Sequence, residues 1–230
     1  MKAIILLLET NLEKVDRLMI DDDRCKGIFP PNIGWLEYNL TQQELDYIWS
    51  CVNHQEVKKN NWKKHLAGNI NSSFLLQDKD DWFYNNTLIN LIGIYGNQYY
   101  NLGKEHPVTK QYTYFLKEWW VNYQYQHEFN PQHKHDGIYS FVIWLKIPTR
   151  FEEQKKLPIA NVSNSNSISN FTFTYCNILG NISSYSYQMN PELEGKLLFF
   201  PSKLVHQVYP YFNCDKERIS ISGNIWIDDR

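Results

Sequence analysis

The sequence has little of what disulfide frameworks and small zinc modules need. It contains four cysteines, Cys25, Cys51, Cys176 and Cys214, and no two of them show a short paired spacing. This pattern excludes a zinc knuckle and a dense set of disulfides. We therefore expect reduced thiols, as in a cytoplasmic protein.

A strong net charge and a long apolar run are also missing. The formal net charge is −2 and the pI is about 6.4, which argues against a dedicated nucleic-acid binder. Since no apolar run approaches roughly 18 residues, we expect no transmembrane helix. The apolar start over 1–8 carries a lysine and meets Glu9 without a cleavage pattern, so we interpret it as a short strand rather than a signal peptide.

The sequence pattern changes near residue 110, within a chain long enough for one large domain. We divide that domain into an N-terminal α/β support region, 1–110, and a β-rich core, 111–230. In the first part, the capping box at 41–44 and the apolar spacing after it predict a helix over 41–54. Similar spacing predicts a helix over 83–101. The lysine-rich run 58–64 indicates a solvated loop.

The second part shows the two-residue period of β-strands. The alternation predicts strands over 119–129, 138–147, 171–178, 195–201 and 217–227, and the Asn/Ser-rich stretch 161–170 predicts a loop. Several short strands separated by loops indicate a β-sandwich or a barrel.

Three histidines of this β-rich part are candidate metal ligands. His133 and His135 are two residues apart, so on one strand both imidazoles point the same way. His206 follows a predicted strand that ends in a proline turn, and it can supply a third ligand. Asp136 would point away on a regular strand, but a turn at Gly137 keeps it as an alternative third ligand. Three ligands on one side of an ion leave open positions for substrate and oxygen.

A second candidate site lies on the last predicted strand. Arg218 and Ser220 are two residues apart, and a guanidinium beside a hydroxyl can hold a carboxylate. The other face of this strand is nearly all isoleucine, so Arg218 is expected to face a polar interior. The alternative is a structural salt bridge with Asp215 or Glu217.

Two further groups of residues have an open interpretation. Asn122 and Gln124 share one polar face, which predicts either contacts with a ligand or a wet rim. The aromatic residues Tyr123, Tyr125, Tyr139 and Trp144 are expected either to wall the site or to belong to the core.

The order of these motifs resembles that of the 2-oxoglutarate/Fe(II) dioxygenases. The phrases over 128–137 (EFNPQHKHDG), 140–148 (SFVIWLKIP) and 195–202 (GKLLFFPS) are similar to members found in bacteriophages. The resemblance covers about 115–227. It implies a mainly β fold with N-terminal helices and a double-stranded β-helix core, which is a jelly roll of the cupin type. It also implies Fe(II), 2-oxoglutarate and O₂ as reactants, with succinate and CO₂ as products.

Residue by residue, the resemblance implies His133, His135 and His206 at the iron and Arg218 with Ser220 at the 2-oxoglutarate. The chain departs from the family pattern at His135, where the family has a carboxylate, so either three imidazoles or Asp136 would complete the site. The substrate would be a small molecule or a peptide, since one iron site can serve many substrates. Two other classes stay open: a cupin-like metal protein without 2-oxoglutarate chemistry, and a virion-associated β-sandwich binding protein.

Overall fold

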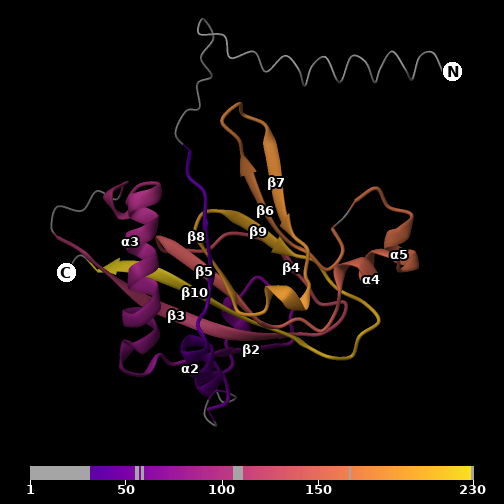
Figure 1. Cartoon of the computed structure of the whole chain (residues 1–230), viewed down its shortest axis with the longest axis horizontal. Helices are drawn as coiled ribbons and strands as arrows, with labels where there is room; N and C mark the ends of the chain where they lie inside the picture. The colour runs from indigo at the N-terminus through magenta and orange to yellow at the C-terminus, as the bar shows by residue number, and fades with distance from the viewer. Residues whose placement is uncertain (1–31, 55–56, 58–59, 106–110, 166, 229–230) are drawn as a thin grey trace, which may run out of the picture. The chain divides into compact units, whose positions relative to one another are not determined.

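The fold is built from two antiparallel β-sheets (Figure 1). The structure is a computed structural model, and it describes residues 32–228 except 55–56, 58–59, 106–110 and 166. The strand expected over 1–8 and Cys25 lie outside the described residues. The other three cysteines are free thiols. No helix in the described part of the chain is long and apolar enough to cross a membrane.

The larger sheet has six strands in the order β1-β8-β5-β10-β3-β2. Their bounds are β1 Leu36–Asn39, β8 Lys196–Pro201, β5 Tyr139–Lys146, β10 Arg218–Asp228, β3 Thr113–Gln124 and β2 Ser72–Leu75. The smaller sheet has the order β4-β9-β6-β7. Its strands are β4 Asn130–His133, β9 Val205–Val208, β6 Phe171–Cys176 and β7 Ile182–Tyr187.

Strands β3 to β10 form a jelly roll by themselves. Of these eight strands, β3, β5, β8 and β10 belong to the larger sheet, and β4, β6, β7 and β9 belong to the smaller one. The remaining strands, β1 and β2, extend the two edges of the larger sheet. The predicted fold class, mainly β with a double-stranded β-helix core, is therefore confirmed.

The larger sheet is buried on both faces. Along β5, Phe141 and Ile143 pack into an outer core with the helices, whereas Val142 and Trp144 pack into an inner core between the sheets. Because side chains alternate across a strand, β5 is apolar at nearly every position. The inner face of this sheet also carries the site described below.

Two helices supply the outer core. Helix α2, Gln42–Val52, begins at Thr41, whose hydroxyl accepts from the backbone N–H of Glu44 in a complete capping box. Helix α3, Ile89–Gln98, continues a π-helical turn over Tyr84–Leu88. Both predicted helices are confirmed except at their ends. The shorter helical segments are α4 Phe151–Lys155, α5 Pro158–Asn161, and the 3₁₀ turns Lys63–His65, Lys79–Asp81, Leu102–Glu105 and Pro191–Leu193.

The strand predicted over 119–129 is too long, because β3 ends at Gln124. A turn follows, in which His127 has a left-handed φ of 71°. The Glu128 N–H donates to the Tyr125 carbonyl over 3.2 Å, and the Glu128 carboxylate accepts from the Tyr125 N–H over 2.9 Å. These local bonds close the turn and start β4 in the other sheet. The other predicted strands are confirmed as β5, β6, β8 and β10, and 162–170 contains no helix or strand among its described residues.

Candidate active site

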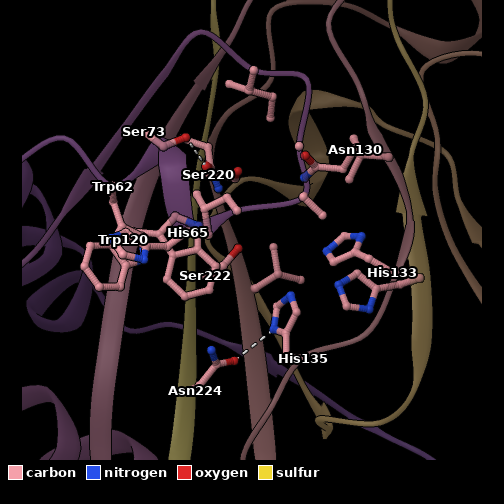
Figure 2. Close-up of a pocket in the computed structure, with 18 of the residues that line it drawn as sticks. Trp62, His65, Ser73, Trp120, Asn130, His133, His135, Ser220, Ser222 and Asn224 are labelled. Atoms are coloured by element: carbon pink, nitrogen blue, oxygen red, sulfur yellow. Dashed lines mark hydrogen bonds between the residues drawn. The ribbon is translucent and has the colours of Figure 1, made fainter.

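The structure brings the three histidines together between the two sheets. His133 ends β4 and pairs in register with His206 on the neighbouring strand β9. His135 follows two residues after His133, in the loop beyond β4 rather than on the strand as expected. The candidate ligand nitrogens all lie within 4.8 Å of one another. Figure 2 shows His133 and His135 on the same side of the cavity.

Each imidazole is oriented by an acceptor at its Nδ1 atom. The Pro131 carbonyl lies 2.7 Å from Nδ1 of His133, and the Leu204 carbonyl lies 2.9 Å from Nδ1 of His206. Because a carbonyl only accepts, Nδ1 carries the proton and the lone pair is left on Nε2. Nδ1 of His135 meets an asparagine side-chain oxygen at 2.9 Å, with the same consequence. This is the arrangement that holds metal-binding histidines in proteins.

Burial keeps these imidazoles neutral. Desolvation lowers the pKa of His133, lowers that of His135 to about 4, and lowers that of His206 well below its usual value. The neighbouring imidazoles lower the pKa of His135 and His206 further, because a second positive charge is unfavourable so close by. Neutral imidazole is the form that binds a metal, so the cluster is ready for an ion at neutral pH.

The structure does not bring Asp136 into this cluster. Its side chain is 84% exposed and lies 3.2 Å from the ammonium nitrogen of Lys203. Gly137 has a left-handed φ of 93°, and an added Cβ there would lie 2.7 Å from the Ile225 carbonyl oxygen. The chain does turn at this glycine, as the sequence suggested, but His135 faces the other two histidines while Asp136 faces Lys203.

Arg218 lies in the same cavity and is only 1% exposed. One terminal nitrogen donates to the Ser169 carbonyl and hydroxyl, over 3.0 and 2.6 Å, and the other approaches the Gln124 side-chain oxygen at 3.4 Å. Its Nε has no hydrogen-bond partner. No acidic group of the described residues forms an ion pair with it, so the expected alternative, a bridge to Asp215 or Glu217, is wrong. Burial lowers the pKa of Arg218 to about 10, which still leaves a cation at neutral pH.

A cavity of about 480 Å³ joins the histidine cluster to Arg218. This volume is within the range of small-molecule sites. The polar face of β3 and β10 lines it with Asn122, Gln124, Ser220 and Ser222. The Asn122 oxygen accepts from Ser73 over 2.7 Å, and the Gln124 amide donates to the Glu128 carbonyl over 2.6 Å. Both amides are buried and fixed in place rather than lying at a wet rim.

The aromatic wall of the cavity differs from the one that the sequence predicts. Of Tyr123, Tyr125, Tyr139 and Trp144, only Trp144 lines the cavity. Tyr139 and Tyr123 pack in the outer core, and Tyr125 is 42% exposed. The reason is strand alternation, because the residue that shares a face with Asn122 and Gln124 is Trp120. Besides Trp144, the wall is made by Trp62, Trp120, Phe171, Phe200 and Trp226, of which Trp62 and Trp120 are labelled in Figure 2.

Sequence reasoning missed some of these residues for different reasons. The two-residue period of β3 already places Trp120 and Glu118 on the polar face, so that signal was present. Trp62, which stacks on His65 with ring centroids 4.1 Å apart, lies in the lysine-rich run assigned to a solvated loop. The lysines of that run that are described, Lys63 and Lys64, are exposed as expected, but the loop itself borders the cavity.

Known proteins resemble both the sequence and the fold. Residues 118–224 match the family described as "Putative 2OG-Fe(II) oxygenase". The matched segment contains the three histidines, Asp136 and the residues near Arg218, namely Asn122, Gln124, Arg218 and Ser220, although it is a little under half of the chain. The match supports the resemblance to 2-oxoglutarate/Fe(II) oxygenases, which are oxidoreductases. No curated protein matches the chain.

Three solved structures show the extent of the structural similarity. A prolyl-4-hydroxylase from Pseudomonas putida is 15% identical, covers 86% of this chain and 94% of its own, and has a TM-score of 0.47. A 2OG-Fe(II) oxygenase family oxidoreductase from Burkholderia pseudomallei is 11% identical, covers 86% of each chain, and has a TM-score of 0.47. The alpha-ketoglutarate-dependent epimerase SnoN of nogalamycin biosynthesis is 12% identical, covers 84% and 78%, and has a TM-score of 0.49. At such similarity, the case for a function comes from the residues of the site.

Proposed function

We propose that this protein is a 2-oxoglutarate- and Fe(II)-dependent oxygenase that hydroxylates a small-molecule or peptide substrate in the cytoplasm, the host's if a phage encodes it. One observation carries the proposal. The buried cation of Arg218 has no acidic partner among the described residues. It shares one cavity with three neutral imidazoles whose Nε2 lone pairs can bind a metal. A buried charge is costly unless it is paired, so an acidic ligand in this cavity would complete the site.

In this proposal the metal is held by His133, His135 and His206. The donor set fits a divalent transition metal, because all three Nε2 lone pairs are left for it and imidazole binds iron well. Three protein ligands leave open positions for 2-oxoglutarate and then O₂. When bound, the iron and 2-oxoglutarate would supply an O₂-dependent oxidation, in which one oxygen atom of O₂ converts a C–H bond to an alcohol and the other enters succinate as 2-oxoglutarate loses CO₂.

Arg218 would bind the far carboxylate of 2-oxoglutarate, with Ser220 adding a hydroxyl donor. Ser169 and Gln124 hold the guanidinium through its terminal nitrogens, and the cation lies over the ring of Tyr211 at 5.0 Å. The Gln124 amide is itself held by a backbone carbonyl, which directs its oxygen toward the arginine. A fixed guanidinium loses little conformational entropy when the ligand binds.

The aromatic wall would keep water from the reacting centre. Trp120 is 4% exposed and its ring lies 5.8 Å from that of His135, and Phe171 packs 5.6 Å from the ring of His206. These large rings shield part of His135, which is half-buried, and help to bury His206. Exclusion of water strengthens the electrostatic interactions inside the site.

A metal-binding protein of the cupin type, without 2-oxoglutarate chemistry, is the second candidate. Three histidines are also a donor set of zinc enzymes, so the metal cluster alone would suit it. In such a protein Arg218 would have no ligand to bind, and 2-oxoglutarate would add nothing to metal affinity.

An anaerobic titration with Fe(II) and then 2-oxoglutarate separates the two candidates. Wild type should develop the weak visible charge-transfer band of an iron–2-oxoglutarate chelate. In Arg218→Gln, iron binding should persist while 2-oxoglutarate affinity falls well over tenfold, since truncating one partner of a buried charge pair costs roughly 2–5 kcal/mol. The matched control is Arg150→Gln, which removes an exposed arginine paired with Glu192. Equal 2-oxoglutarate affinity in wild type and Arg218→Gln would favour the second candidate.

A further inference from the structure

A polar row crosses the inner face of the larger sheet beside the histidine cluster. Asn224 on β10 is the register partner of Glu118 on β3 and of Ser140 on β5. The Asn224 amide nitrogen donates to the Glu118 carboxylate over 2.7 Å. The Asn224 oxygen lies 2.9 Å from Nδ1 of His135 and accepts from the Ser140 hydroxyl over 2.8 Å. Figure 2 shows the bond between Asn224 and His135.

Glu118 determines which groups of this hydrogen-bonded row donate and which accept. A carboxylate only accepts, so it selects the NH₂ side of the Asn224 amide and leaves the oxygen toward His135. That oxygen in turn selects the tautomer of His135 with the proton on Nδ1. His133 and His206 get the same tautomer from backbone carbonyls, which no side chain can reverse. His135 is therefore the one histidine of the cluster whose tautomer depends on another side chain.

We propose that Glu118 is a positioning residue for the third metal ligand, His135. It rests on the proposed function, because it takes His135 as a ligand. Through Asn224, Glu118 fixes Nε2 of His135 as the binding atom and places a negative charge two hydrogen bonds from the imidazole. The three imidazoles contribute no negative charge to the ion themselves. Glu118 on β3 thus supplies, from outside the ligand set, a carboxylate in place of the one that the 2-oxoglutarate/Fe(II) dioxygenases have at the position of His135. Partners of this kind raise ligand basicity and orient the ring.

The burial of the row supports this role. Asn224 is 7% exposed and Ser140 is fully buried, so each polar atom needs a partner inside the protein. If Gln replaced Glu118, the Asn224 amide could turn and offer its NH₂ group to Nδ1 of His135, because Gln can accept or donate where the carboxylate only accepts. The proton of His135 would then move to Nε2, and that nitrogen could no longer bind a metal.

The test compares four proteins by titration with Co(II), whose visible absorption reports binding without redox chemistry. Glu118→Gln should weaken Co(II) binding about 10- to 100-fold, as loss of such partners usually does. The double variant Glu118→Gln with Asn224→Asp moves the charge one position along the row and keeps every hydrogen bond. It should bind Co(II) at least as well as wild type. The matched control, Glu152→Gln, removes an exposed carboxylate from α4 and should bind as wild type does.

Histidine-ring NMR of the metal-free proteins supplies a readout that a purely structural role would not change. His135 should carry its proton on Nδ1 in wild type and in the double variant, and should populate the Nε2–H tautomer in Glu118→Gln. Unchanged Co(II) affinity and tautomer in a folded Glu118→Gln would overturn the proposal, and so would a double variant that fails to recover. Failure of wild type to bind any divalent metal would instead overturn the proposed function on which it rests.

Discussion

At the residue scale, the hydrogen bonds around each side chain matter as much as its identity. His133 and His206 are held by carbonyls two residues earlier in the chain, so their orientation is local. His135 and Arg218 are held by residues far away in sequence, Asn224 and Ser169. A substitution far away in sequence can therefore change the orientation of His135 or Arg218, but it leaves the local acceptors of His133 and His206 in place. The site is therefore most sensitive at His135 and Arg218.

The third ligand can be decided by two alanine variants. His135→Ala should abolish stoichiometric binding of Fe(II), because His135 belongs to the cluster. Asp136→Ala should leave the affinity within a few-fold of wild type, because that carboxylate faces Lys203 and solvent. Anaerobic Fe(II) titration measures both, with His54→Ala as a control for an exposed histidine outside the cavity. A larger loss in Asp136→Ala would make Asp136 the ligand.

The lowered pKa values of the histidines predict an acid-sensitive metal-free protein. The pKa of His135 falls from 6.5 to about 4 in the fold, so the unfolded chain binds more protons than the folded one in this range. The contribution of neutral His135 to the free energy of unfolding should be fully present above pH 6.5. It should be lost as the pH falls from 6.5 toward 4. Thermal melts of metal-free protein between pH 7.5 and 5 check this. His135→Gln should show a shallower decline, and an equal decline would assign the effect to other groups.

At the element scale, short local signals set the ends of helices and the faces of strands. The capping box of α2 joins Thr41 to Glu44, whose carboxylate is buried and also accepts from Thr87 over 2.6 Å. On β10, Arg218, Ser220, Ser222 and Asn224 line the cavity, while Ile219, Ile221 and Ile225 pack in the outer core. The helix supports the outer face of the sheet, and the strand presents the site on the inner face.

Removal of the helix cap should lower stability without changing the site. Thr41→Ala should destabilise the protein by about 1 kcal/mol, the usual cost of losing a threonine N-cap. Chemical denaturation measures this, with the exposed neighbour Gln43→Ala as a control that should cost less. Metal affinity should stay at the wild-type value in both variants. A change in metal affinity in Thr41→Ala would mean that α2 influences the site through the sheet.

At the scale of the whole molecule, the site exists because two sheets face each other. The smaller sheet contributes His133 and His206, and the larger sheet contributes Arg218, Ser220 and Asn122. Neither sheet carries both halves of the site. A ligand that contacts both halves should therefore hold the two sheets together.

Combined ligands should raise the melting temperature of the protein. A ligand at 100 times its dissociation constant contributes about 2.7 kcal/mol, and each kcal/mol shifts Tm by roughly 2–4 °C at this chain length. With Mn(II) as a redox-stable substitute for iron, metal and 2-oxoglutarate together should raise Tm by several degrees more than metal alone. His206→Ala should lose both shifts, and Arg218→Gln only the 2-oxoglutarate part. Shifts of equal size in His206→Ala would place binding elsewhere.

The sequence by itself determined the local part of this protein. The period of two assigned Arg218 and Ser220 to one face of β10, and the capping box placed the start of α2. Both features follow from strand and helix geometry, which depends on near neighbours in the chain. For the same reason, the sequence contained the signal for Trp120, which shares the polar face with Asn122. The alternation alone indicated a β-sandwich or a barrel, and the jelly roll was implied by the resemblance.

Only the tertiary structure decided which distant groups meet. The turn after β3, the choice of His135 over Asp136 for the cluster, and the lack of an acidic partner for Arg218 depend on how segments far apart in sequence pack. The link from Glu118 through Asn224 to His135 depends on the register of β3, β10 and β5. Strand register is fixed by burial of whole faces and by turns elsewhere in the fold, so no local pattern contains it.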